Sequence, residues 1–211
     1  MILFGTDGIR GRYGDFPLDD STIKKIGCSI AKSFGNTVKK VIIGHDGRES
    51  CGAIIDSLTE GINFINNYDI INLGLFPTPS LSLILSKNDS EDAIGIEITA
   101  SHNPYLDNGI KIFDKNGYKI SSELERKIEE IVATQNDVNI TSSTKFVDSS
   151  PMKSVYIDFI SGLLSSIKKC RTHLNVAVDC ANGATSHVIN DITFPDNISL
   201  KIFNNLSLIH I

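Results

Sequence analysis

Short apolar segments alternate with segments of helical periodicity along the first two-thirds of the chain. Four runs have the length and the continuous apolar character of buried strands: residues 41–44, 69–74, 93–99 and 109–113. Apolar residues at helical spacing fill the intervening and flanking segments, at 19–35, 50–65, 77–85 and 122–132. Ser122 and Glu125 are expected to form a capping box at the start of the last helix. A strand that is apolar on both faces has to be covered by helices on both sides. The alternation therefore predicts an α/β protein built as a three-layer α/β/α sandwich.

The sheet is expected to be mixed, and a second unit is expected to follow it. The segment between strands 93–99 and 109–113 is too short for a crossover helix, so that pair is predicted to be antiparallel. A tight Asp-Asn-Gly turn is expected at 107–109, before the second strand. The first domain is assigned to residues 1–140, and the Ser/Thr-rich stretch 141–152 is interpreted as a linker. Residues 153–211 show the pattern of a helix, a strand, a helix start and a strand. That pattern predicts an incomplete second α/β/α domain.

Charge and composition argue against two broad classes of function. Lys and Arg number 20 against 25 Asp and Glu, a net charge of −5, whereas a nucleic-acid-binding domain carries a basic face. No apolar run approaches the ~18 residues that span a bilayer, and the first residues lack the apolar core of a secretory signal. The cysteines have no zinc or C-x-x-C spacing and are expected to be reduced thiols: Cys28, Cys51, Cys170 and Cys180. We therefore expect a cytoplasmic protein with no nucleic-acid or membrane partner.

The segment ITASHNPYLDNGIKIF, residues 98–113, carries the strongest indication of chemistry. A predicted strand ends at Thr99, which places Ser101 at the rim of the sheet, where α/β proteins bind their ligands. An exposed serine there can accept a phosphoryl group, because neighbouring backbone N–H groups can hold the charge. A serine-hydrolase site is excluded, because adjacent Ser101 and His102 side chains do not form a nucleophile–base pair and no G-x-S-x-G elbow is present.

Two further segments supply glycines and cations. FGTDGIRG, residues 4–11, is interpreted as a glycine-rich loop in which Gly8 exposes backbone amides and Arg10 offers a fork for phosphate oxygens. Lys111 lies between two isoleucines and is therefore expected on the opposite face of its strand from them. In HDGRES, Asp46 and Arg48 follow a strand and are interpreted as a structural ion pair.

Taken together, three segments resemble the α-D-phosphohexomutase superfamily. They are FGTDGIRG at 4–11, TASHNP with DNGIKIF at 99–104 and 107–113, and DCANGA at 179–184. Within the superfamily they most resemble the phosphoglucosamine mutases of bacteria. The resemblance covers most of the chain and identifies residues 1–140 with the first α/β/α domain of the superfamily.

The resemblance implies an isomerase that interconverts glucosamine 6-phosphate and glucosamine 1-phosphate for UDP-N-acetylglucosamine synthesis. It implies that Ser101 is a phosphoserine, which phosphorylates the sugar and is rephosphorylated from a 1,6-bisphosphate intermediate. Gly8, Arg10, Asn103 and Lys111 are then expected to bind phosphate or substrate. Either Lys111 or His102 would take the sugar hydroxyl proton. One Mg²⁺ is implied, bound in part by the phosphate on Ser101.

Departures from the superfamily pattern qualify these expectations. The motifs D-G-D-x-D-R and G-E-x-S-G-H, which carry the remaining metal ligands and the sugar contacts, are absent, and the match ends near Asn205. The sequence is therefore interpreted as the N-terminal part of a longer enzyme. This part is expected to be inactive by itself, and the longer enzyme is expected to be a homodimer. The alternatives are a phosphoglucomutase or phosphomannomutase of the same superfamily, and a non-catalytic fragment that binds phosphate at most.

Overall fold

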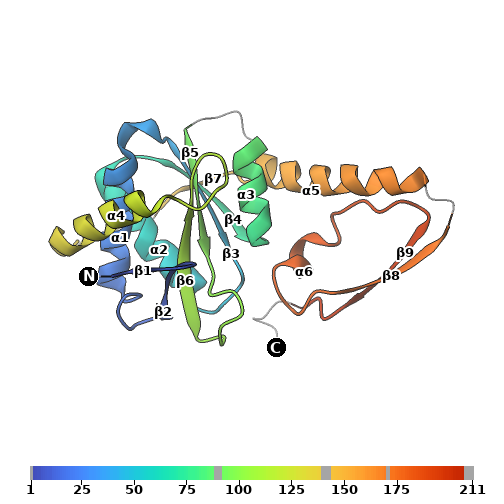
Figure 1. The fold of residues 1–211 in the computed structure, drawn as a ribbon, viewed down its shortest axis with the longest axis horizontal. Helices are drawn as coiled ribbons and strands as arrows, with labels where there is room; N and C mark the ends of the chain where they lie inside the picture. The colour runs from blue at the N-terminus through green and yellow to red at the C-terminus, as the bar shows by residue number, and fades with distance from the viewer. Residues whose placement is uncertain (1, 88–91, 139–143, 170–171, 207–211) are drawn as a thin grey trace.

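The computed structural model describes residues 2–87, 92–138, 144–169 and 172–206. Its first part is a mixed seven-stranded sheet in the order β1-β2-β6-β5-β3-β4-β7 (Figure 1). The strands are β1 (Phe4–Gly5), β2 (Gly8–Arg12), β3 (Lys40–His45), β4 (Asp69–Leu75), β5 (Ala93–Ile98), β6 (Asp107–Phe113) and β7 (Phe146–Val147). Strands β3, β4, β5 and β7 are parallel, whereas β6 is antiparallel to both of its neighbours. The expected mixed sheet is thus confirmed.

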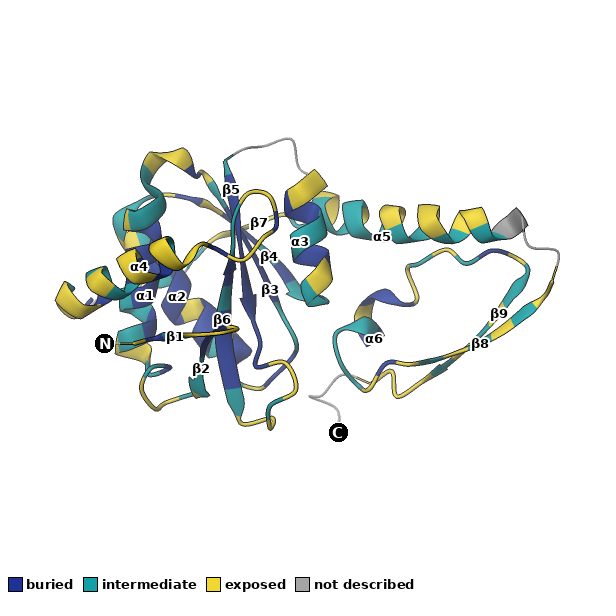
Figure 2. Cartoon of the chain, viewed as in Figure 1, coloured by how far each residue is buried: buried dark blue, intermediate teal, exposed yellow. Residues whose placement is uncertain are grey.

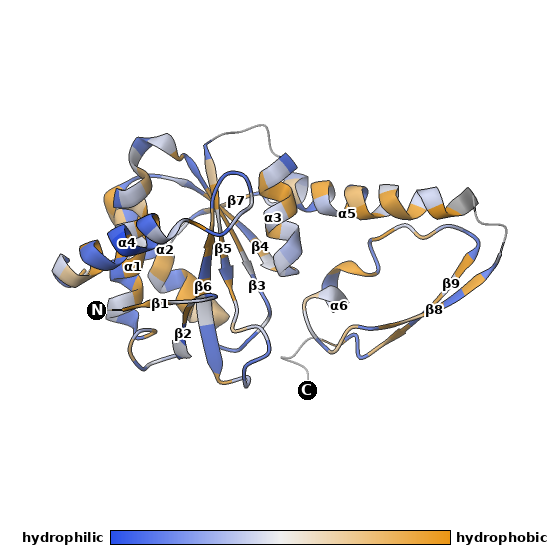
Figure 3. Ribbon diagram, in the orientation of Figure 1, coloured by the Kyte–Doolittle hydropathy of each residue, from blue (hydrophilic) through white to orange (hydrophobic). Residues whose placement is uncertain are grey.

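Helices cover both faces of this sheet, as a three-layer sandwich requires (Figure 1). On one face, α1 (Asp20–Phe34), α2 (Cys51–Ile65) and α4 (Ser122–Thr134) enclose the larger apolar core, which includes Ile43, Ile96 and Ile110. On the other face, α3 (Thr78–Lys87) packs on a smaller core. Figures 2 and 3 show that the central strands are the most buried and among the most apolar elements of the chain.

The connections between the parallel strands create a switch point at the carboxyl ends of β3 and β5. The chain passes from β3 through α2, on one face, to β4, and then through α3, on the opposite face, to β5 on the other side of β3. Strands β3 and β5 are neighbours, but the chain continues from β3 to β4 on one side and from β5 to β6 on the other side. A crevice at such a point is where open α/β sheets bind their ligands.

Helices α1 and α2 pack so closely that two glycines are required at their crossing. A Cβ at Gly27 would lie 2.1 Å from the carbonyl oxygen of Leu58, and a Cβ at Gly61 would lie 2.1 Å from that of Lys24. The Cys28 thiol donates to the Gly61 carbonyl at 3.2 Å. Because both contacts are with backbone, no side-chain rotation can relieve them.

A smaller unit follows the sheet. Helix α5 (Ser150–Ser165) contacts α3, and beyond it β8 (Leu174–Asp179) and β9 (Ile198–Phe203) form a parallel pair, with the short α6 (Thr185–Val188) between them. These elements match the predicted helix, strand, helix start and strand. Both strands alternate between half-buried and exposed residues, and no described residue of α5 is fully buried (Figure 2).

Several local expectations were wrong. Residues 4–11 form an antiparallel hairpin, β1 and β2, instead of an open loop, because β2 pairs with β6 through backbone hydrogen bonds that the local sequence does not reveal. The predicted Asp-Asn-Gly turn at 107–109 is the beginning of β6. The cap of α4 is Ser121, whose hydroxyl accepts from the N–H of Leu124, and not Ser122.

The expected linker, 141–152, contains regular structure where it is described. Residues 141–143 lie outside the described residues, as does Cys170, but β7 adds to the edge of the sheet beside β4 and α5 begins at Ser150. The three described cysteines are free thiols and buried: Cys28, Cys51 and Cys180. The domain limits at residues 140 and 153 stay predictions.

The helix crossing gives a first test of the fold. Replacing Gly61 by alanine should lower the free energy of unfolding by at least about 2 kcal/mol, because the new methyl group forces α1 and α2 apart. Gly52, in the first turn of α2, has nothing within 4 Å of its Cβ position. Gly52→Ala should therefore be neutral, or stabilising by up to ~1 kcal/mol. Urea unfolding followed by far-UV circular dichroism compares the two, and equal stabilities would contradict the close crossing.

Candidate functional site

The loop after β5 presents Ser101 at the switch point. Ser101 has φ of 59°, a left-handed conformation that is uncommon for a residue with a side chain. Its backbone N–H donates to Thr99 Oγ1 at 2.9 Å, and its side chain is exposed. A strained backbone at a strand end is a frequent feature of functional sites, because the surrounding structure must hold it in place. The hydroxyl is therefore directed to solvent by a fixed loop.

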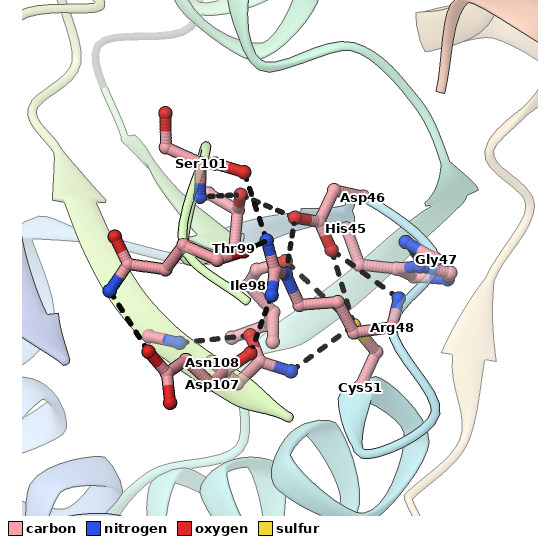
Figure 4. Close-up of polar contacts among 12 residues, drawn as sticks. His45, Asp46, Gly47, Arg48, Cys51, Ile98, Thr99, Ser101, Asp107 and Asn108 are labelled. Atoms are coloured by element: carbon pink, nitrogen blue, oxygen red, sulfur yellow. Dashed lines mark hydrogen bonds and ion pairs between the residues drawn. The ribbon is translucent and has the colours of Figure 1, made fainter. Parts of the chain in front are cut away.

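The Arg48 guanidinium holds this loop. It is buried, with 8% of the residue exposed, and follows β3, the strand beside β5. Its Nη2 donates to the carbonyl oxygens of Ser101 (2.9 Å) and Asn103 (3.1 Å), and its Nη1 donates to those of Asp107 (2.8 Å) and Pro104 (Figure 4). With Nε on Asp46, all five donors of the guanidinium are used. One side chain thus fixes four carbonyls of the loop.

Asp46 links Arg48 to the start of the same loop. Its Oδ2 accepts from Arg48 Nε at 2.9 Å and from Thr99 Oγ1 at 2.6 Å (Figure 4). The ion pair that the sequence predicted is confirmed. The contact between this ion pair and the serine loop was missed in the sequence. The signal was a D-x-R pattern directly after one strand and the serine shortly after the adjacent strand.

Asn108 fixes the other end of the loop. It is fully buried at the start of β6, and its Nδ2 donates to Ser50 Oγ at 2.9 Å. The same Nδ2 donates to the Cys51 sulfur, as Figure 4 shows. Burial raises the pKa of the Cys51 thiol to about 11, so this cysteine stays a neutral packing and hydrogen-bonding group. Both ends of the serine loop are therefore tied to the segment that runs from the end of β3 to the first residue of α2.

The β1–β2 hairpin contacts the serine loop through Arg10 and strand β6 through Gly8. Arg10 Nη1 donates to Asn103 Oδ1 at 3.3 Å, and its Nη2 forms an ion pair with Asp7, also at 3.3 Å. Gly8, with φ of 99°, lies against Lys111, since a Cβ at Gly8 would be 3.2 Å from Lys111 Cγ and 2.5 Å from the Ile110 carbonyl oxygen. A side chain at position 8 would displace the strand that carries the lysine.

Lys111 lines a pocket of about 250 Å³ together with Asp7, Gly8 and Thr78. His102 is exposed next to Ser101. Within the described part of the chain, neither Lys111 nor His102 has a hydrogen bond to the Ser101 hydroxyl. The choice between them as proton acceptor therefore stays open, as it was from the sequence.

Metal-ligating side chains are not grouped in the described residues. No three of His, Cys, Asp and Glu among them are placed to bind one ion. A hard divalent cation needs several oxygen ligands together. The residues described here therefore do not form a complete Mg²⁺ site, and a ligand from phosphate on Ser101 stays a prediction.

Substituting Arg48 should release the serine loop. Arg48→Lys keeps the charge but loses the planar fork, so most of its bonds to the loop carbonyls are lost. We expect amide hydrogen exchange over residues 100–108 to become at least ~10-fold faster, which is about 1.4 kcal/mol of lost protection. Arg126, exposed on α4, supplies the matched control, Arg126→Lys. Unchanged exchange in Arg48→Lys would mean that the fork does not hold the loop.

A buried carboxyl beside the site predicts a pH dependence. Burial raises the pKa of Glu97 well above its ordinary value, and the nearby Asp46 raises it further. The folded state therefore binds a proton that the unfolded state releases, so stability should decline as pH rises above about 4.3. Glu97→Gln should remove this decline and raise stability at neutral pH. Thermal unfolding measured across the pH range compares the stability of Glu97→Gln with that of the unaltered protein. Parallel dependences of stability on pH would contradict the burial of the Glu97 carboxyl.

Comparison with known proteins agrees with this fold. The family model described as phosphoglucomutase/phosphomannomutase, alpha/beta/alpha domain I, matches residues 1–139. A phosphoglucosamine mutase of Aliarcobacter butzleri is 39% identical over 197 residues, which make up 89% of this chain and 43% of that protein. One from Anaplasma marginale is 31% identical, over 97% of this chain and 45% of that protein. The chain thus spans less than half the length of these curated relatives.

A solved structure shows the same fold. A phosphoglucomutase/phosphomannomutase family protein from Burkholderia thailandensis superposes with a TM-score of 0.72 at 21% identity, over 98% of this chain and 45% of that chain. In the described parts of the present chain, no helix is both long and apolar enough to cross a membrane. With a family model that matches from the β1–β2 hairpin through the serine loop to the end of α4, this chain belongs to the phosphoglucomutase/phosphomannomutase family.

Proposed function

We propose that this chain is the phosphoserine-bearing part of a phosphoglucosamine mutase. The observation that carries the proposal is the Ser101 hydroxyl, exposed on a strained loop whose carbonyls are fixed by Arg48. Relatives named as phosphoglucosamine mutases support the choice of a glucosamine phosphate as substrate. The activity belongs to the longer protein, of which these residues supply the phosphoryl-carrying loop and its cations.

In the proposed reaction the Ser101 phosphate is transferred to a sugar hydroxyl. The bond between phosphorus and Ser101 Oγ breaks as the bond to the sugar oxygen forms, and the sugar proton passes to Lys111 or His102. The resulting bisphosphate returns its other phosphoryl group to Oγ. Phosphoryl transfer depends mainly on positioning and on offsetting charge. The fixed loop supplies the first, and Arg10 supplies the second, joined by the Lys111 ammonium where His102 is the proton acceptor.

A divalent cation would add charge neutralisation at the phosphoryl oxygens when bound. In this chain only the phosphate of Ser101 is proposed as its ligand, and the remaining ligands would come from elsewhere in the longer protein. The roles of Arg10, Asn103 and Lys111 do not depend on it, because their contacts lie within the described hairpin and loop.

Phosphorylation of Ser101 is the direct test. Protein purified from its native cells should carry one phosphoryl group, and mass spectrometry should place it on the peptide that contains Ser101. Ser101→Ala should abolish the modification, whereas Ser122→Ala, at an exposed serine in α4, should leave it intact. Phosphate found only on other peptides would refute the assignment.

Catalytic contributions are measured in a chimera. Residues 1–139 replace the matching domain of the A. butzleri enzyme, and conversion of glucosamine 6-phosphate is assayed beside glucose and mannose phosphates. Arg10→Ala or Lys111→Ala should each lower kcat at least ~10²-fold, about 2.7 kcal/mol of transition-state stabilisation. Lys39→Ala, at an exposed site before β3, should not. Wild-type kinetics in either test variant would make that residue a surface cation only, and a preference for glucose or mannose phosphates would change the assigned substrate.

A further inference from the structure

His45 lies at the carboxyl end of β3, directly before the turn that carries Asp46 and Arg48. Its backbone carbonyl accepts a hydrogen bond from the N–H of Phe76. Its partners on the neighbouring strands β4 and β5 are apolar residues, Leu75 and Ile98, and the histidine itself is half-buried. His45 therefore belongs to the segment that holds the serine loop.

The His45 ring closes this turn by accepting a hydrogen bond. The backbone N–H of Gly47 donates to Nδ1 at 3.1 Å. Gly47 is buried and has φ of 92°, a left-handed conformation. The N–H of Arg48 donates in a similar way to Asp46 Oδ1, at 3.4 Å. Two successive side chains thus fix the backbone that leads into Arg48.

The contact with Gly47 depends on the protonation state of His45. An imidazole nitrogen accepts a hydrogen bond only while it carries no proton. The contact therefore assigns the neutral ring, with its proton on Nε2, because a proton on Nδ1 would meet the N–H of Gly47. A buried N–H that loses its partner is costly. Protonation of His45 at Nδ1 is thus incompatible with this turn.

The surroundings of the ring also act on its charge. Burial lowers the pKa of the His45 imidazole below its ordinary value, the Asp46 carboxylate opposes this, and His187 of α6 adds to it. Burial keeps two further groups neutral near this turn: the Cys51 thiol, which contacts Asp46, and the Glu97 carboxyl, which lies against the residue before His45. The folded chain therefore binds a proton at His45 less readily than the unfolded chain, so this contribution to stability declines as pH falls below about 6.5.

We propose that His45 is a positioning residue for Arg48: the guanidinium is held against the serine loop only while the His45 imidazole is neutral. Protonation at Nδ1 breaks the bond from Gly47 and loosens the turn, and Arg48 loses its fixed place at the loop carbonyls. The left-handed backbone of Ser101 then loses the bond to its carbonyl. The effect on phosphoryl transfer rests on the proposed function, whereas the link between His45 and the loop does not.

NMR titration of residues 1–211 between about pH 8 and pH 5 tests the link. Long-range proton–nitrogen spectra should show Nε2 protonated and Nδ1 bare in the neutral ring. The resonances of the Gly47 amide, Arg48 Nε and the Ser101 amide should then change with the midpoint of His45. Across that midpoint, protection of the amides of residues 100–108, corrected for the intrinsic effect of pH on exchange, should fall at least ~5-fold. A proton on Nδ1 of the neutral ring, or loop resonances that stay constant while His45 titrates, would overturn the proposal.

Two substitutions assign the effect to this ring. His45→Asn provides an amide oxygen that accepts from Gly47 at every pH in the range, so the loop should keep its protection at neutral pH and lose the acid-dependent fall. His187→Asn removes the other histidine and should leave the fall in place. A fall that persists in His45→Asn, or disappears in His187→Asn, would overturn the role of His45. If His45→Asn does not fold, the shared midpoint in the unaltered chain decides.

The outcome is independent of the proposed function, because none of these measurements requires phosphate. Native protein without a phosphoryl group on Ser101 would refute the proposed function and leave the link between His45 and the loop intact. Conversely, a phosphorylated Ser101 on a loop that does not respond to His45 would overturn this proposal alone.

Discussion

The site depends on one buried guanidinium that makes five hydrogen bonds. Arg48 donates to Asp46, to three carbonyls of the loop between β5 and β6, and to the carbonyl of Asp107 at the start of β6. The carbonyl of Ser101 is one of them, so its left-handed backbone is held by a residue that follows the adjacent strand as well as by the local bond to Thr99. Helices α2 and α3, which leave the sheet on opposite faces, bring β3 and β5 side by side and make this contact possible.

Strands that are marked by an apolar pattern in their own residues could be predicted from the sequence. The apolar runs at 41–44, 69–74 and 93–99 correspond to β3, β4 and β5, and the lack of room for a helix predicted the antiparallel β6. The β1–β2 hairpin could not be predicted, because three glycines in this segment are untypical of a strand. Strand β2 is stabilised by pairing with β6, about a hundred residues away in the sequence. Strand β7 has two residues and is a strand only because β4 has a free edge.

In the site, too, features set by local residues could be predicted, and features set by residues distant in the sequence could not. Ser101 could be identified from its own segment, since a small polar residue after an apolar run marks the rim of a sheet. The function of Arg48 could not, because its partners are backbone carbonyls 53 to 59 residues away, and carbonyls leave no pattern in a sequence. Glu97 escaped notice for a related reason. In the sequence it is one acid in an otherwise apolar strand. Its neighbours in the fold are Gly44, Thr78 and Lys111, which lie on three different elements.

Glycines set where charge can be placed in this domain. Gly44 leaves the space that the Glu97 carboxyl fills, and Gly8 leaves the space through which the Lys111 stem passes. Both lie directly beside the strand that carries the charged residue, so a methyl group at either position would meet a carboxyl oxygen or backbone. Gly8, which suggested a phosphate-binding loop in the sequence, therefore makes room for the side chain of Lys111. It permits close approach of the hairpin to β6, and in the proposed function the cation that this approach positions, Lys111, acts on phosphate.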